Sequence, residues 1–369
     1  MGSRKRHIDG LKGAACLLIM LGHFSGLYKY AQNCTAIDAP FLQLIPYSLL
    51  AEGFWLRLFY VLSGYLVSRS RVLTARELAR KSMTRFFRLA LPILGAALFI
   101  LPIAELFGIH NHEIQSLVPN QWVDMTYSVP LTVRGAITEP LRVLLFGAST
   151  FNPVWWVLRD MFFASLLVYL ITWTRNLLSA GQRAATVCAE LVLPAVIVFF
   201  IVTGNDIYFS VLIGALYGTH EAIVSRAIGH RKWICRILLL APLAGFRDPN
   251  WVPHPGVLCS TDFSFVCFLF AVSQLRGPNT VFSKLEKLGS ISFGIYSLHW
   301  PVFCSVGMLM IIKGIANMPG SRIYLISVLV SGIITICLSI LFHATVERWS
   351  GAVCRKLDRL LAGTRGTAS

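Results

Sequence analysis

Hydrophobic residues in this chain are gathered into long runs, and short polar segments separate them. A bilayer core about 30 Å thick is crossed by roughly 20 mostly apolar residues of α-helix. Eight runs have about this length: 11–28, 50–68, 86–107, 153–173, 186–203, 257–275, 289–312 and 322–344. Two shorter runs, 207–219 and 233–245, are weaker candidates. The pattern predicts an all-α, polytopic integral membrane protein with about ten transmembrane helices in one bundle.

The composition agrees with a membrane protein and excludes several soluble classes. Hydrophobic residues make up 56% of the 369 residues and charged residues only 14%, whereas soluble domains are about 45–50% apolar and about 25% charged. A soluble enzyme, a disordered chain and a soluble nucleic-acid binder are therefore excluded. The nine cysteines are scattered and lack metal-binding spacing, so we expect neither a disulfide framework nor a metal site.

The net charge of +16 is explained by the predicted topology. With a cytoplasmic N-terminus and alternating spans, most of the 33 lysines and arginines fall on the cytoplasmic side, as the positive-inside rule requires. Membrane lipids are therefore expected partners and nucleic acid is not. The topology gives a short cytoplasmic N-terminus at 1–10 and a basic cytoplasmic tail at 345–369. It places the polar stretch 108–152 outside, where it can form a lid or a binding loop.

The first span carries two ionisable side chains on one helix face. Lys12 and His23 are eleven residues apart, which is close to three helical turns and about 16 Å along the axis. Ionisable groups inside a bilayer are costly and usually functional. The spacing predicts a cation at the cytoplasmic lip below an imidazole near the middle of the membrane. A structural role stays open, with His23 bonded to a neighbouring helix and Lys12 anchoring the span.

Two arginines mark the cytoplasmic entry to the third span. Arg85 and Arg88 are three residues apart and share a helix face. Guanidinium groups bind phosphate oxygens through two parallel hydrogen bonds. The pair therefore predicts a phosphate-binding rim, and a contact with anionic lipid headgroups is the alternative.

Five segments carry a resemblance to a known family. They are HIDGLKGAACLLIMLGHF at 7–24, LFYVLSGYL at 58–66, Arg85-x-x-Arg88 followed by Pro92, LGSISFGIYSLHWP at 288–301 and HATVER at 343–348. In this order they resemble the motifs of the acyltransferase-3 family of polytopic membrane acyltransferases. The carbohydrate O-acetyltransferases of that family include enzymes that act on exopolysaccharide and on nodulation factors.

The resemblance implies a membrane-bound O-acyltransferase built as a single domain over 1–369. It implies that His23 is the catalytic general base and that acyl-CoA, expected to be acetyl-CoA, is the co-substrate, with no bound cofactor. Lys12 stands where the family carries an arginine, so the charge is kept and the forked geometry is lost. The expected location is a bacterial inner membrane with both termini in the cytoplasm.

The remaining site residues follow from the same resemblance and from charge. The acyl-CoA phosphates are expected to dock on Lys12, Arg85 and Arg88. Candidates for orienting the acceptor or stabilising an oxyanion are Tyr296, His299, Asp160 and Glu347. A covalent acyl-histidine relay stays open beside a single displacement.

One segment of the sequence bears on the identity of the acceptor. The segment WWVLRD at 155–160 is similar to a variant found in relatives that act on polysaccharides. We therefore expect a carbohydrate or glycolipid acceptor, such as exopolysaccharide, lipopolysaccharide or lipo-oligosaccharide, ahead of a macrolide or a lipid. A membrane transporter of a glycan or acylated intermediate is the alternative, although the sequence lacks the inverted repeats typical of transporters.

Overall fold

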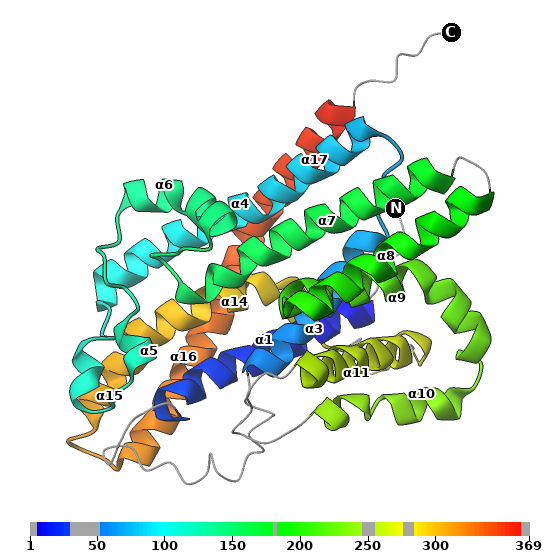
Figure 1. Cartoon of the computed structure of the whole chain (residues 1–369). Helices are drawn as coiled ribbons and strands as arrows, with labels where there is room; N and C mark the ends of the chain where they lie inside the picture. Colours follow the sequence, from blue (N-terminus) through cyan, green and yellow to red (C-terminus); the bar gives the residue numbers. More distant parts are fainter. Residues whose placement is uncertain (1–5, 30–51, 180–182, 246–254, 276–283, 363–369) are drawn as a thin grey trace.

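Helices make up all the regular structure in the described part of this computed structural model, residues 6–29, 52–179, 183–245, 255–275 and 284–362 (Figure 1). The long helices are α1 (Arg6–Lys29), α3 (Glu52–Ser68), α4 (Ala75–Phe107), α7 (Trp156–Ser179), α8 (Arg183–Thr203), α9 (Asp206–Ile228), α11 (Pro255–Gln274), α14 (Ser292–Val302) and α16 (Gly320–Phe342). The remaining helices are α5 (Gln121–Asp124), α6 (Val133–Leu141), α10 (Lys232–Leu238), α13 (Glu286–Ser290), α15 (Met308–Gly314) and α17 (Arg348–Ala362). The predicted all-α class is confirmed.

Six helical stretches within the described residues are long and apolar enough to cross a bilayer. They are His7–Leu27, Ala75–Phe107, Pro153–Ser179, Asp206–Ile228, Ser292–Gly314 and Gly320–Ala362. Two shorter apolar helices, Glu190–Thr203 and Thr261–Gln274, lie beside them. This arrangement is consistent with a polytopic membrane protein, but the predicted count of ten spans is not confirmed.

The two weaker predicted spans have different outcomes. The run 233–245 is not one helix, because α10 has seven residues and a separate turn, η5 (Ala241–Gly245), follows it. At 1.5 Å per residue α10 is about 10 Å long, far short of a bilayer core. The run 207–219 is longer than predicted, since it belongs to the 23-residue helix α9.

Close backbone contacts hold α1 in place. A Cβ added to Gly13 would lie 2.6 Å from the Leu288 Cβ, and one added to Gly289 would lie 1.8 Å from the Asp9 carbonyl oxygen. Both glycines come from family-like segments, and each leaves room for the other helix. The Cys16 thiol also donates to the Ser292 carbonyl over 3.2 Å. These contacts place the lysine- and histidine-bearing face of α1 beside α14.

The predicted outer stretch 108–152 is an ordered cap at one end of the bundle. It contains the turn η2 (Glu113–Ser116), α5, α6 and the π-helical turn η3 (Arg142–Phe146), which lie at the left of Figure 1. The Asn120 amide donates to the carbonyls of Gly26 and Leu27 over 3.2 and 3.3 Å. The cap is therefore fastened to the end of α1.

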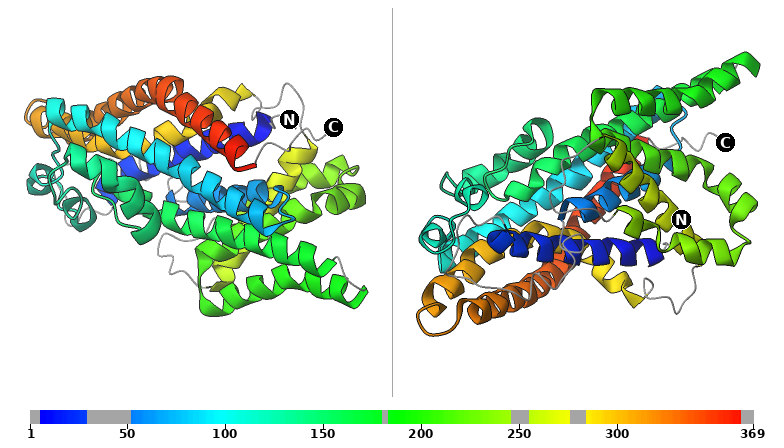
Figure 2. Two further views of the ribbon diagram at one scale, coloured as in Figure 1. Left: turned by 90° about the horizontal axis from the view of Figure 1, so that it is seen from above. Right: turned by 60° about the horizontal axis from the view of Figure 1, so that its bottom comes forward.

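The predicted basic tail at 345–369 is helical as far as Ala362. The π-helical turn η7 (His343–Glu347) joins α16 to α17, and α17 packs along α4. The Arg80 guanidinium pairs with Asp358 over 2.6 Å. Figure 2 shows α16 and α17 on one side of the molecule beside α4, with α8–α11 gathered on the other. The segments 1–5 and 363–369, at the ends of the predicted N-terminus and tail, lie outside the described residues.

Candidate functional site

Two histidines from distant parts of the chain meet at the centre of the site. The His23 Nδ1 and the His299 Nε2 are 3.0 Å apart, although 276 residues separate them in sequence. His23 is partly exposed, whereas His299 is completely buried. The other ring nitrogen of His299, Nδ1, lies 2.9 Å from the Ile295 carbonyl oxygen one turn earlier in α14.

These bonds fix the tautomers of two neutral rings. A carbonyl oxygen only accepts, so the His299 Nδ1 carries the hydrogen and donates it to Ile295. The His299 Nε2 then holds a lone pair and accepts from the His23 Nδ1. The hydrogen of His23 is thereby committed to Nδ1, and its Nε2 keeps a lone pair with no hydrogen-bond partner among the described residues. In the neutral state His23 is oriented as a base.

Aromatic rings surround His23. The Trp122 ring, from α5 in the cap, lies nearly parallel to the His23 ring, at 9° with the centroids 6.1 Å apart. Trp300 meets both rings, with centroid distances of 6.3 Å to His23 and 4.6 Å to Trp122. The cap therefore contributes a side chain directly to the surroundings of the imidazole.

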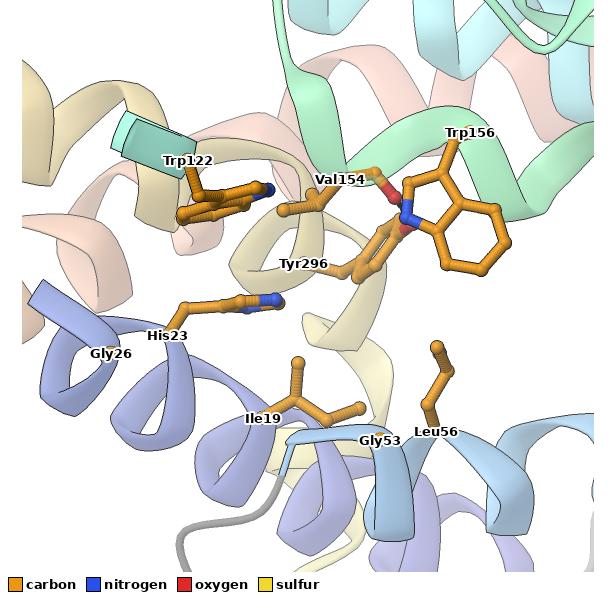
Figure 3. A pocket seen from close by; sticks show the side chains of 9 residues that line it. All are labelled: Ile19, His23, Gly26, Gly53, Leu56, Trp122, Val154, Trp156 and Tyr296. Carbon is orange, nitrogen blue, oxygen red and sulfur yellow. Dashed lines mark hydrogen bonds between the residues drawn. The ribbon is translucent and has the colours of Figure 1, made fainter. Parts of the chain in front are cut away.

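His23 opens into a cavity of about 420 Å³, which we call the His23 cavity (Figure 3). The residues that line it are Ile19, His23, Gly26, Gly53, Leu56, Trp122, Val154, Trp156 and Tyr296. Figure 3 shows the His23 ring extending into this space between Trp122 and Ile19. The lining is mostly apolar, and the imidazole is its clearest titratable group.

A second cavity, of about 210 Å³, lies next to it. We call it the basic cavity, because Lys12 and Arg85 are among its lining residues. Leu56 and Tyr296 line both cavities. On α1 the sequence positions 12 and 16 face the basic cavity and 19 and 23 face the His23 cavity, as expected for one helix face.

Arg85 and Arg88, near the middle of α4, have different surroundings. The Arg85 guanidinium donates to the Ser63 hydroxyl over 3.3 Å, and its buried Nε has no hydrogen-bond partner among the described residues. Arg88 is exposed and lines neither cavity. The predicted pair is thus split, and only Arg85 reaches the interior.

A buried carboxylate orders the segment that forms one cavity wall. Glu139 is completely buried and accepts hydrogen bonds from Ser149 and from the Thr150 side chain and backbone. The Tyr296 hydroxyl donates to the Val154 carbonyl, so its hydrogen is already used. These contacts hold the start of α7 against α14.

The other two predicted residues lie away from the imidazole pair. Asp160 is on α7, 3.5 Å from the Arg159 guanidinium, and lines neither cavity. Glu347 pairs with His343 in η7, and its second oxygen is buried with no hydrogen-bond partner among the described residues.

Sequence reasoning missed a buried ion-pair cluster behind the cavity wall. Arg57 is 4% exposed and contacts Asp262 on α11 at 2.5 Å and Asp206 on α9 at 2.7 Å. An arginine inside an apolar run was the feature of the sequence that could have indicated the cluster. Its partners Asp206 and Asp262 could not be identified, because they lie 149 and 205 residues away in sequence. Trp122 and Trp156 were also missed as site residues, because indoles are common in membrane proteins.

Comparison with protein families decides what kind of protein carries this site. The model of the acyltransferase-3 family, described as an acyltransferase domain, matches residues 6–344. The chain belongs to the acyltransferase-3 family. No curated protein and no solved structure gives a significant match.

In this acyltransferase the family-like motifs converge in space. The first motif supplies Lys12 and His23, the second supplies Ser63, and the third supplies Arg85. The fourth supplies Tyr296 and His299. All of them line the two cavities or contact a residue that does, so four of the five motifs share one location in the fold, and the fifth, at 343–348, lies outside it.

Proposed function

We propose that this acyltransferase moves an acyl group, most simply acetyl, from acyl-CoA to a hydroxyl of a carbohydrate acceptor within the membrane. The observation that carries the proposal is the pair of adjoining cavities. One has two cationic side chains, the other has an oriented imidazole, and Leu56 and Tyr296 line both. A long substrate with an anionic end and a reactive thioester end matches this arrangement.

The basic cavity is the proposed entry for acyl-CoA. Lys12 and Arg85 supply two positive charges to the phosphates, and the apolar wall between them and His23 suits the pantetheine arm. Arg85 already holds the Ser63 hydroxyl, and its unpaired Nε is available as a further donor. Charge-assisted bonds to phosphate are stronger than neutral ones. Arg88, being exposed, is left with a secondary role at the rim.

The reaction proposed at His23 is a single displacement. The free Nε2 lone pair takes the proton of the acceptor hydroxyl while the hydroxyl oxygen attacks the thioester carbonyl carbon. The C–O bond forms, the C–S bond breaks, and the CoA thiolate takes the proton back from the imidazolium. The products are the O-acyl ester and CoA thiol. General-base catalysis of this kind typically contributes about 10²–10⁴-fold.

His299 is proposed as a positioning residue and not as a group that touches the substrate. Its only free acceptor, Nε2, is taken by His23, and it is completely buried. By accepting from the His23 Nδ1 it stabilises the imidazolium that forms during transfer, the part that a third group takes in serine-histidine triads. We propose this positioning role for His299 in place of the role that the sequence suggested, which was to orient the carbohydrate acceptor or stabilise an oxyanion.

Comparison of the glycans of a deletion strain and its complemented parent tests this proposal. We expect mass spectrometry to show loss of one or more O-acetyl groups in the deletion strain and their return on complementation. Unchanged acetylation would contradict the proposal. If unmodified intermediates also accumulated on one side of the membrane, the transporter alternative would be favoured.

A further inference from the structure

A polar strip runs away from the His23 cavity between α3 and α7. Gly53, Leu56 and Tyr60 lie three and four residues apart on one face of α3, and the first two line the cavity. Trp156 and Asp160 are four apart on α7, and Trp156 also lines the cavity. Helices α3 and α7 pack together, and Tyr60 and Asp160 each lie one turn beyond a residue that lines the cavity.

Tyr60, on this face of α3, has not been given a role so far. Tyr60 is 4% exposed, and its hydroxyl has no hydrogen-bond partner among the described residues. It interacts electrostatically with Tyr296 on one side and with Asp160, Asp206 and Arg57 on the other. The hydroxyl oxygen is not fully enclosed, so a ligand beside it can supply a hydrogen-bond partner.

The neighbouring side chains define the chemistry of that ligand. Trp156 is 48% exposed and presents a flat apolar face beside Tyr296 (Figure 3). The Asp160 and Asp206 side chains keep 21% and 42% of their surface exposed, so their carboxylates have room to accept further hydrogen bonds. An indole beside carboxylates and a phenol fits a ring with apolar C–H faces and hydroxyl edges.

We propose that Trp156, Asp160 and Tyr60 form the subsite that holds the acceptor sugar next to His23. The proposal rests on the proposed acyl transfer and narrows its acceptor. The sugar ring stacks on Trp156, and its hydroxyls donate to Asp160 and bond with Tyr60, which leaves one hydroxyl directed toward His23. Asp160 lies beside Arg159, so the subsite selects the sugar by its ring face and hydroxyls and not by a net charge.

The test uses membranes of a deletion strain complemented with each variant, because these membranes contain the natural acceptor. The probe is acetyl-CoA labelled in the acetyl group. Two products are measured at matched protein abundance: label in ester-linked glycan, released by hydroxylamine, and label in free acetate from transfer to water. Their ratio reports acceptor binding separately from use of acetyl-CoA.

Four substitutions address the subsite directly. We expect Trp156→Ala and Asp160→Asn to lower the glycan-to-acetate ratio by about tenfold or more, equivalent to about 1.4 kcal/mol of acceptor binding, with an unchanged KM for acetyl-CoA. Tyr60→Phe is expected to lower the ratio less than these two substitutions. Trp156→Phe, which keeps an aromatic face, is expected to give a ratio between those of Trp156→Ala and the parent. Matched controls are Tyr65→Phe, at the far end of α3 where it bonds Glu221, and Trp349→Ala on α17, both with the parent ratio.

The outcomes separate this subsite from the proposed function. A parent ratio in both Trp156→Ala and Asp160→Asn overturns the subsite. Parallel loss of both products in these variants at normal abundance also overturns it, because acceptor binding alone spares the transfer to water. No ester-linked label with the unsubstituted protein refutes the acyl transfer itself.

Discussion

At the scale of single residues, the chemistry depends on which nitrogen of His23 carries its hydrogen. The chain of bonds from the Ile295 carbonyl through His299 leaves the lone pair on the His23 Nε2. A substitution that removes the hydrogen-bond acceptor of His299 but keeps the shape of its ring distinguishes a role in positioning His23 from a role in packing. His299→Phe keeps an aromatic ring but removes the nitrogen that accepts from His23, whereas His299→Gln keeps an amide oxygen that can accept the same hydrogen bond.

We expect kcat to fall by about 10²-fold in His299→Phe and by less in His299→Gln, with the KM for acyl-CoA unchanged. The measurement is the initial rate of CoA release in isolated membranes at matched abundance. Equal kcat values in the parent and in His299→Phe would show that His299 serves packing alone.

The different environments of Arg85 and Arg88 give a second prediction. Arg85→Ala should raise the KM for acyl-CoA by about tenfold, because a charge-assisted bond is worth about 1.5–3 kcal/mol. Arg88→Ala should raise it less, since that side chain is exposed. Arg76→Ala, an exposed arginine at the start of the same helix, serves as the charge-matched control. Similar KM values in Arg85→Ala and Arg76→Ala would leave Arg85 as a lipid anchor.

Individual site residues differed in how far the sequence alone could place them. His23 and Lys12 were predictable, since a charged or titratable group in an apolar run is unusual and helical spacing fixes its face. The bond from His23 to His299 was not, because local periodicity contains no information about partners 276 residues apart. For the same reason the sequence did not predict which aspartates pair with Arg57.

At the scale of helices, close packing of α1 against α13 determines where the face bearing His23 lies. A methyl group on Gly289 would lie 1.8 Å from the Asp9 carbonyl oxygen, and backbone atoms have no room to move aside. Gly289→Ala should therefore separate the helices and lower both thermal stability and activity. Gly332→Ala on α16 is the matched control, because its nearest neighbour is the flexible Met20 end at 3.7 Å.

The comparison is made by thermal unfolding of the purified protein in detergent or nanodiscs. We expect a lower Tm and lower activity for Gly289→Ala, and a Tm for Gly332→Ala equal to or above that of the parent, because alanine favours helix by about 1 kcal/mol over glycine. Equal Tm values for the two variants would contradict the close contact.

Helix positions were predicted better than helix lengths. Hydrophobic runs located most of the long helices, since burial in a bilayer or in a bundle requires apolar side chains. They failed at 233–245, where an apolar run is divided into α10 and η5. They also shortened α9, which continues past residue 219 through His220 and Glu221, and Glu221 pairs with Arg69. Hydropathy treats such a paired charge as the end of a span.

At the scale of the whole molecule, charge predicts orientation. The basic end of the bundle carries Lys12, Arg85 and α17, and the cap 108–152 lies at the other end. The positive-inside rule places the basic end in the cytoplasm, where acyl-CoA is made. A green fluorescent protein fused after Ser369 should fluoresce, and alkaline phosphatase fused after Ser116 should be active. The reverse pattern would contradict the proposed entry of acyl-CoA through the basic cavity.

The central claim is that the His23 imidazole acts as the base in acyl transfer, and His23→Asn tests it most directly. The asparagine amide nitrogen lies near the position of Nδ1 and keeps a donor for His299, whereas the lone pair of Nε2 is lost. At matched membrane abundance we expect transfer of labelled acetyl to glycan to fall by about 10²–10⁴-fold, with abundance and Tm near those of the parent. Retention of most of the transfer activity by His23→Asn would contradict the account.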